Sequence, residues 1–149
     1  ASGAVGMVGG QIIDLQSENK IIDLETVKEM YAKKTGALIA AACVMGCLAS
    51  SVDDKEKLGA AEEYGKCIGL AFQIEDDILD IVSTTDELGK PIGSDEENNK
   101  STYVSILGIE QGRRDIKVLT EKALGLLEVF GDNTESLKEL ALSLVNRQN

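Results

Sequence analysis

Three aspartates stand close together in an apolar stretch near the middle of the chain. Asp76, Asp77 and Asp80 lie within residues 72–80, whose sequence is Phe-Gln-Ile-Glu-Asp-Asp-Ile-Leu-Asp. On an α-helix Asp76 and Asp80 share one face, and Asp77 lies about 100° round from Asp76. Like charges at this spacing disfavour a helix by about 0.2–0.5 kcal/mol per pair. A hard cation that prefers carboxylate oxygen, most simply Mg²⁺, explains the cluster, whereas a solvated acidic face is the alternative for an isolated motif.

Two further pairs of polar residues precede this stretch. Gln11 and Asp14 are three residues apart, so a helix would place an amide and a carboxylate on one face; exposed polar positions are the alternative. Lys34 and Thr35 bring a cation and a hydroxyl onto or near an otherwise apolar helix face. A lysine that reaches water along an apolar surface accounts for Lys34 without any function. A lysine directed at a phosphate inside the protein is the functional interpretation.

A long polar connection follows the aspartates, over residues 83–100. It carries Lys90, Asp95 and Lys100, together with two glycines and the only proline of the chain. Loops of this length in compact domains are often functional. The segment could therefore fold over a phosphate–metal cluster, or it could be a plain linker.

Composition favours an all-α fold and excludes some partners. The 149 residues suffice for one domain, and we expect a single all-helical domain over 1–149. Hydrophobic residues make up 43% of the chain, aromatic residues only 3%, and there is one proline, as is typical of helical proteins. The net charge of −11 argues against binding to nucleic acid or anionic lipid, because phosphate binding needs clustered lysine and arginine.

The three cysteines indicate a reducing environment. Cys43 and Cys47 are four residues apart in an alanine-rich helical pattern, and two thiols without further ligands make a poor zinc site. Together with Cys67 they are expected to be reduced, buried and inert, which predicts a cytoplasmic protein. We find no signal peptide and no uncharged apolar run of membrane-spanning character, so we expect no stable membrane anchor.

Apolar periodicity predicts helices over residues 1–15, 24–48, 55–82 and 103–128, and a last helix that ends at 145. Asp23 is the expected N-cap of the second helix, and Thr134 or Ser136 that of the last. The inward positions expected in the fourth helix include Ile106. The second helix is expected to bury one stripe of side chains: Val27, Met30, Tyr31, Leu38, Ala41 and Met45.

The motifs, in their order and spacing, resemble those of the trans-isoprenyl (polyprenyl) diphosphate synthases, and most closely the bacterial farnesyl diphosphate synthases. The likeness covers residues 1–113 and rests on these runs: Gly10-Gln11-x-x-Asp14, Lys34-Thr35-Gly36, Phe72-Gln73-x-x-Asp76-Asp77-x-x-Asp80, Leu88-Gly89-Lys90, Gly93-Ser94-Asp95 and Lys100-Ser101-Thr102-Tyr103. It implies an all-α helical bundle around a deep cavity, usually a homodimer. It also implies Mg²⁺-dependent, head-to-tail condensation of isopentenyl diphosphate with an allylic diphosphate.

The resemblance also implies roles for the metal-binding and diphosphate-binding residues. Asp76 would be the main Mg²⁺ ligand of the second aspartate-rich motif, with Asp77 beside it and Asp80 supporting through water. Lys34 and Lys90 would hold the allylic diphosphate. Asp95 and Lys100 would close the loop over the metals.

For the reacting carbon chains the resemblance implies a second set of residues. Thr35 and Gln73 match groups that stabilise the allylic cation, and Phe72 would contact the isopentenyl chain. Gln11 and Asp14 match polar groups that line the site. An amide oxygen and a hydroxyl suit this role because they stabilise a cation without capturing it as a stronger nucleophile would.

The chain departs from the family in one important way. Family members are considerably longer and carry a first aspartate-rich motif and an arginine pair upstream of this region. The chain, which opens without methionine inside a helical pattern, therefore corresponds to the C-terminal half of such a protein, and we predict that it is inactive alone. Product length stays open between farnesyl and geranylgeranyl or longer diphosphates. A non-catalytic helical partner subunit is the alternative from another functional class.

Overall fold

The structure, a computed structural model, describes residues 1–82 and 100–145. Within these ranges the secondary structure is helical, as predicted, and contains no strand. The elements are α1 (Met7–Ser17), α2 (Leu24–Tyr31), the π-helical turn η1 (Ala32–Gly36), α3 (Ala37–Ala49), α4 (Lys55–Val82), α7 (Tyr103–Leu107), α8 (Ile109–Leu126), the 3-10 turn η2 (Leu127–Phe130) and α9 (Glu135–Val145).

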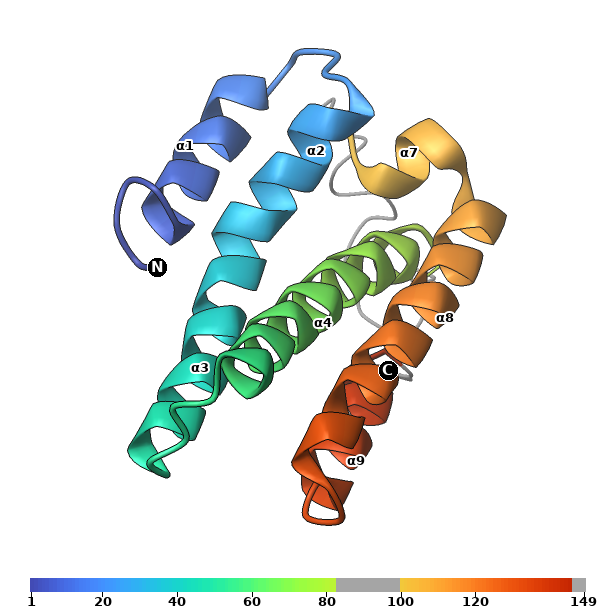
Figure 1. Ribbon diagram of the computed structural model, residues 1–149. Coiled ribbons are helices and arrows are strands. Elements are labelled where there is room, and N and C mark those ends of the chain that lie inside the picture. Colours follow the sequence, from blue (N-terminus) through green and yellow to red (C-terminus); the bar gives the residue numbers. More distant parts are fainter. Residues whose placement is uncertain (83–99, 146–149) are drawn as a thin grey trace.

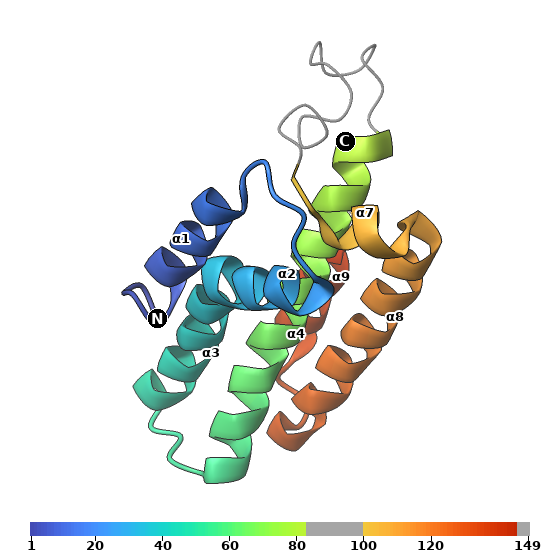
Figure 2. The same cartoon turned by 90° about the horizontal axis from the view of Figure 1, so that it is seen from above.

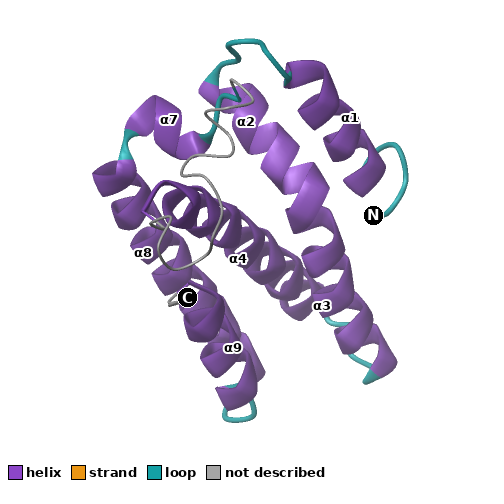
Figure 3. Ribbon diagram, turned by 180° about the vertical axis from the view of Figure 1, so that it is seen from behind, coloured by secondary structure: helices purple, strands orange, loops and turns teal. Residues whose placement is uncertain are grey.

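The long helix α4 is the centre of the arrangement. One side of α4 packs against α3 and the other against α8, which are its two most extensive helix contacts (Figure 1). Seen from above, α1 lies on the outer side of the continuous rod formed by α2, η1 and α3 (Figure 2). The short α7 packs against α2 and leads into α8, and α9 returns along α8 and α4 (Figure 3). The all-α bundle follows from this order of amphipathic helices.

Two apolar clusters hold the helices together. The first cluster includes Val27, Ile74 and Ile78, each with no exposed surface, and joins α2, α4, α7 and α8. The second cluster includes Tyr64 and Leu127 and joins α4 to α8, η2 and α9. Burial of apolar area contributes about 25 cal/mol per Å², so these clusters supply the main stabilisation.

Glycine allows α3 and α4 to approach each other unusually closely. A β-carbon on Gly65 would lie 2.5 Å from the α-carbon of Ala40, and one on Gly69 would lie 2.7 Å from the α-carbon of Gly36. Real β-carbons essentially never come so close, and any larger residue at either position would push the helices apart.

The π-helical turn corrects the predicted buried stripe. Before η1 the stripe is right, since Val27 and Tyr31 are buried; after it the stripe is wrong, since Leu38 is 43% and Met45 61% exposed. A π-helical turn contains one extra residue, which rotates the following side chains by about 100° relative to an uninterrupted α-helix. Ala40 is buried against α4 instead.

The helix predicted over residues 103–128 is in fact two helices. Gly108, at φ 83°, separates α7 from α8, and a left-handed backbone of this kind favours glycine. The break redirects α7, and Ile106, predicted to point inward, is 39% exposed. Thr102 caps α7 by accepting from the backbone amide of Ser105, whose hydroxyl in turn accepts from the amide of Thr102.

The predicted start of α2 is confirmed. The Asp23 carboxylate accepts a 2.8 Å hydrogen bond from the backbone amide of Thr26. The Thr26 side chain, and after it this backbone amide, lower the pKa of Asp23. All three cysteines are free thiols, as expected, but only Cys67 is buried as predicted, whereas Cys43 and Cys47 are partly exposed. By length and composition alone, residues Leu24–Ala49 would also suffice to cross a membrane, which the sequence pattern did not lead us to expect. This is weak evidence, because core helices pass the same test.

Candidate active site

A polar pocket of ≈ 190 Å³ lies where α1, η1, α4 and the start of the α7 segment meet. Its charged lining comes from three carboxylates and two lysines. The full lining is Asp14, Ser17, Met30, Tyr31, Lys34, Gln73, Asp76, Asp77, Lys100, Ser101 and Thr102. Residues that are far apart in sequence therefore converge here, and most of the predicted site residues of the described ranges are among them.

A second hollow, of ≈ 590 Å³, lies between α3, α4, η2 and α9. Its lining is mainly aliphatic and includes Cys43 and Cys47, and none of the described residues that line it carries a charge. Burial, together with the neighbouring Cys47, raises the pKa of the Cys43 thiol, so this thiol stays protonated and weakly reactive at neutral pH. Acid–base or metal chemistry therefore belongs to the smaller polar pocket.

Gly10 sets the position of α1 over the pocket. A β-carbon on Gly10 would lie 2.7 Å from the α-carbon of Lys34 and closer still to its backbone nitrogen. The α1 backbone therefore rests directly on η1, which only glycine permits. One turn further along the same face, Asp14 is carried over the polar pocket.

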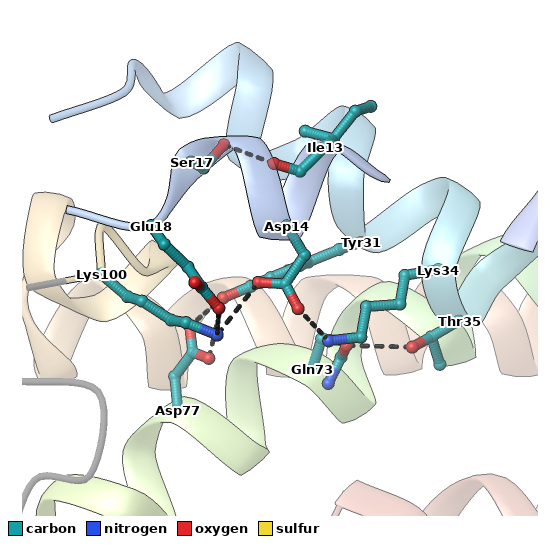
Figure 4. A network of polar contacts seen from close by, with 10 residues as sticks. All are labelled: Ile13, Asp14, Ser17, Glu18, Tyr31, Lys34, Thr35, Gln73, Asp77 and Lys100. Carbon is teal, nitrogen blue, oxygen red and sulfur yellow. Dashed lines mark hydrogen bonds and ion pairs between the residues drawn. The ribbon is translucent and has the colours of Figure 1, made fainter. Parts of the chain in front are cut away.

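Asp14 bonds two lysines from opposite sides of the pocket. Its carboxylate accepts a 2.6 Å hydrogen bond from Lys34 and a 3.2 Å bond from Lys100, whose ammonium also lies 3.8 Å from Glu18 (Figure 4). Burial by itself would raise the pKa of Asp14. The hydrogen bonds and charges of the two lysines outweigh burial and hold this pKa below its ordinary value of 3.8. Asp14 is therefore ionised at neutral pH.

Thr35 and Gln73 form the second polar pair. The Thr35 hydroxyl donates a 2.9 Å hydrogen bond to the side-chain oxygen of Gln73, which links η1 to α4 (Figure 4). Since Lys34 and Thr35 both lie within the π-helical turn, this local irregularity positions both side chains. Single-turn π-bulges occur frequently at functional sites.

Asp77 is held by protein donors. The Tyr31 hydroxyl lies 2.8 Å from each oxygen of the buried Asp77 carboxylate, and the Tyr103 backbone amide donates to it at 3.0 Å. The carboxylate thus ties α2 and the start of α7 to α4. This arrangement indicates a structural role for Asp77, in addition to any contact that it makes with a bound ligand.

The other predicted residues fall into three groups. Asp76 is exposed and lines the pocket. Asp80 and Phe72 are half-buried on α4, and Gln11 is exposed on α1; these three lie outside the pocket lining. Two further predicted site residues, Lys90 and Asp95, are outside the described residues.

Sequence reasoning missed the polar role of Tyr31 and Tyr103. Tyr31 was assigned only to an apolar stripe, yet a buried tyrosine hydroxyl usually needs a hydrogen-bond partner. That rule, applied to a helix predicted to pack near three aspartates, would have indicated a Tyr–Asp contact. No comparable signal exists for the Tyr103 amide, because its position depends on the course of the chain after residue 99.

The carboxylates of the pocket suit a magnesium ion that is coordinated partly by the protein and partly by a bound ligand. Among the residues that the structure describes, no three metal-ligating side chains converge on one point. Mg²⁺ commonly takes one or two carboxylates, several waters and substrate phosphates, so it does not need such a cage. The exposed Asp76 fits this pattern and could hold the ion.

This all-α arrangement around a lysine–carboxylate pocket corresponds to a known protein family. The family model described as polyprenyl synthetase matches residues 2–140, and the chain belongs to that family.

Known relatives agree with this assignment. The chain is 40% identical over 150 residues to the farnesyl diphosphate synthase of Escherichia coli K12, with 99% of the chain and 50% of the relative covered. It is 43% identical over 145 residues to the geranylgeranyl diphosphate synthase of Cyanophora paradoxa, with 97% and 48% covered. The chain spans about half the length of these relatives.

A solved structure shares the fold. The geranyltransferase of Helicobacter pylori, complexed with magnesium and isoprenyl diphosphate, superposes with a TM-score of 0.75 at 31% identity. The match covers 97% of this chain and 48% of that one. The fold is therefore that of about half of an isoprenyl diphosphate synthase, and the family predicted from the motifs is confirmed.

Proposed function

We propose that this chain provides the diphosphate- and metal-binding part of a prenyltransferase. The reaction is the head-to-tail condensation of isopentenyl diphosphate with an allylic diphosphate, dimethylallyl or geranyl, with release of diphosphate. The observation that carries the proposal is the convergence of Lys34, Lys100 and Asp76 on one polar pocket. Lysines and a metal-binding carboxylate together are what a diphosphate leaving group requires.

The charges of the pocket support a role for Mg²⁺. Among the residues that the structure describes, Asp14, Asp76 and Asp77 outnumber Lys34 and Lys100 in the pocket lining, so these side chains alone would repel an anionic diphosphate. A divalent cation held by Asp76, with Asp80 supporting it through water, reverses that balance. When bound, the ion stabilises the negative charge of the departing diphosphate as a Lewis acid.

The remaining residues take the parts that the motifs imply. Lys34 and Lys100 donate to diphosphate oxygens from two sides of the pocket, Lys90 is a further candidate donor, and Asp95 is a further candidate ligand of the metal. The Gln73 oxygen, held by the Thr35 hydroxyl, presents a partial negative charge to the allylic cation. An amide oxygen oriented in advance stabilises a cation without the cost of reorganisation during the reaction.

Farnesyl diphosphate is the proposed product and geranylgeranyl diphosphate the alternative, because relatives with both names match at similar identity. A homodimer is proposed for the full-length protein. The 149-residue chain is proposed to be inactive by itself, since it spans half of its relatives.

The test is a condensation assay of the full-length protein with isopentenyl and geranyl diphosphates in Mg²⁺, with products identified by mass spectrometry. We expect a farnesyl or geranylgeranyl product that disappears on chelation of the metal, and at least a hundredfold loss of kcat in Asp76→Asn. The absence of any prenyl product, with both substrates intact, would refute the proposal. An Asp76→Asn protein that keeps parental activity would refute the role of Asp76 and favour a non-catalytic subunit.

A further inference from the structure

Asp14 has an unusual position for a residue expected to line a diphosphate site. It is an anion, it is only 8% exposed, and both of its carboxylate oxygens accept from lysines. Two anions do not bind each other, so direct contact between Asp14 and a diphosphate would be unfavourable. Asp14 therefore acts on the ligand through its effect on Lys34 and Lys100.

The two lysines come from separate parts of the chain. Lys34 belongs to η1, whereas Lys100 follows α4 and precedes α7, and Asp14 on α1 is the group that both contact. The segment with Lys100 is also fixed to the connection between α1 and α2, because the Ser101 hydroxyl accepts from the Ile22 amide at 3.2 Å. The three elements therefore meet at the Asp14 carboxylate.

The contacts leave both ammonium groups able to bind a further anion. An ammonium group has three N–H donors, and each lysine uses one of them for Asp14. The side chains of Lys34 and Lys100 remain 36% and 24% exposed and both line the pocket. A long, flexible lysine fixed at its charged end loses less conformational entropy when the ligand arrives.

We propose that Asp14 is a positioning residue: by bonding both ammonium groups, it sets their spacing and makes Lys34 and Lys100 bind a diphosphate as a coupled pair. This inference rests on the proposed function, and deepens it by giving Asp14 a task other than substrate contact. It has a specific consequence, because loss of either lysine should disturb the other through their shared carboxylate.

The experiment measures binding of Mg²⁺ and inorganic pyrophosphate to the full-length protein by isothermal titration calorimetry. We expect Asp14→Asn to weaken binding about tenfold, because an amide holds two ammonium groups poorly. Glu18→Gln is the matched control: it removes the same charge beside Lys100 but has no contact with Lys34, and we expect less than a twofold change. Should Asp14→Asn not fold, Asp14→Glu, which keeps the charge and moves the carboxylate by one methylene, should weaken binding as well.

A double-mutant cycle separates positioning from a general structural effect. With Asp14 present, Lys34→Met and Lys100→Met together should weaken binding by less than the product of their single effects, because each single change already disturbs the other lysine. In the Asp14→Asn or Asp14→Glu background the two effects should multiply.

The possible failures are distinct. Absence of pyrophosphate binding by the parent protein would overturn both the proposed function and this inference. Parental binding together with unchanged or tighter binding by the Asp14 variant would overturn the inference alone, since Asp14 would then merely repel the ligand. Independent lysine effects in the parent background would overturn it equally.

Discussion

The hydroxyl of Tyr31 lies 2.8 Å from each carboxylate oxygen of Asp77. The contact is buried and joins residues 46 positions apart, so it fixes α2 against α4 at the wall of the polar pocket, which both residues line. The second aspartate of the acidic motif is thus part of the framework, whereas its neighbour Asp76 is exposed to the pocket.

This difference predicts opposite effects for the two neighbouring aspartates. Asp77→Asn should lower the free energy of unfolding by about 2–3 kcal/mol, because the buried carboxylate loses charge-assisted bonds and one amide nitrogen faces a donor. Asp76→Asn should leave stability nearly unchanged and reduce Mg²⁺-dependent pyrophosphate binding. Urea unfolding and calorimetric titration measure the two quantities. Equal destabilisation by both changes would contradict the assignment.

Gly10→Ala should detach α1 from η1. The new methyl group would lie 2.7 Å from the α-carbon of Lys34, and backbone cannot move aside as a flexible side chain can. We expect a loss of about 1–3 kcal/mol of stability, measured by urea unfolding. Gly59→Ala on α4, where the methyl group would meet nothing within 4 Å, is the control and should stabilise by up to about 1 kcal/mol. Similar effects at both positions would exclude a close approach at Gly10.

Thr35→Val should impair turnover more than binding. Valine keeps the shape of threonine but cannot donate to Gln73, so the amide loses its orientation toward the proposed allylic cation. We expect kcat to fall about tenfold to hundredfold with little change in KM, measured by steady-state kinetics of the full-length protein. Thr120→Val, which removes a hydroxyl bonded to the Ile116 carbonyl in α8, is the control. A rise in KM alone would assign Thr35 to substrate binding.

Glu75→Gln should stabilise the protein at neutral pH. Burial raises the pKa of Glu75 above its ordinary 4.5, although the charge of Arg113 partly opposes this. The folded protein therefore binds this proton more tightly than the unfolded chain, and the ionised carboxylate costs stability as pH rises above 4.5. The gain from Glu75→Gln should vanish below that pH.

Thermal unfolding from pH 3.5 to 8 measures this effect. The exposed Glu128 offers a matched control, because Glu128→Gln makes the same chemical change outside the core. A gain that is equal at all pH values, or is shared by Glu128→Gln, would show that desolvation of Glu75 is not its cause.

Much of the fold could be predicted because it follows from local signals. The limits of α4 were predicted to the residue, and the Asp23 cap was predicted from one side chain with the right acceptor. Leu38 and Met45 were misplaced because apolar periodicity assumes a constant number of residues per turn, and η1 breaks it. Ile106 was misplaced because a single glycine in a helical pattern does not reveal its φ angle.

The site was predictable in its membership but not in its contacts. Spacing brought Asp14, Lys34, Gln73 and Asp76 forward as candidates, and the fold places them around one pocket. The hydrogen bonds between the Asp14 carboxylate and the two lysines depend on the packing of α1 against η1, which Gly10 sets. They also depend on the position of Lys100 after α4. Contacts between residues so far apart in the chain produce no periodic pattern in the sequence.

The π-helical turn between Tyr31 and Ala37 has a consequence for the evolution of the family. Because it holds one residue more than an α-helix needs, a one-residue deletion there could be absorbed without breaking the rod. Such a deletion would nevertheless turn α3 by about 100° relative to α2 and take its small residues out of contact with α4. The length of this turn therefore sets both the positions of the Lys34 and Thr35 side chains and the packing of α3 against α4, so selection acts on the two together. We expect insertions and deletions to be absent from this turn among active relatives, even where its individual residues vary.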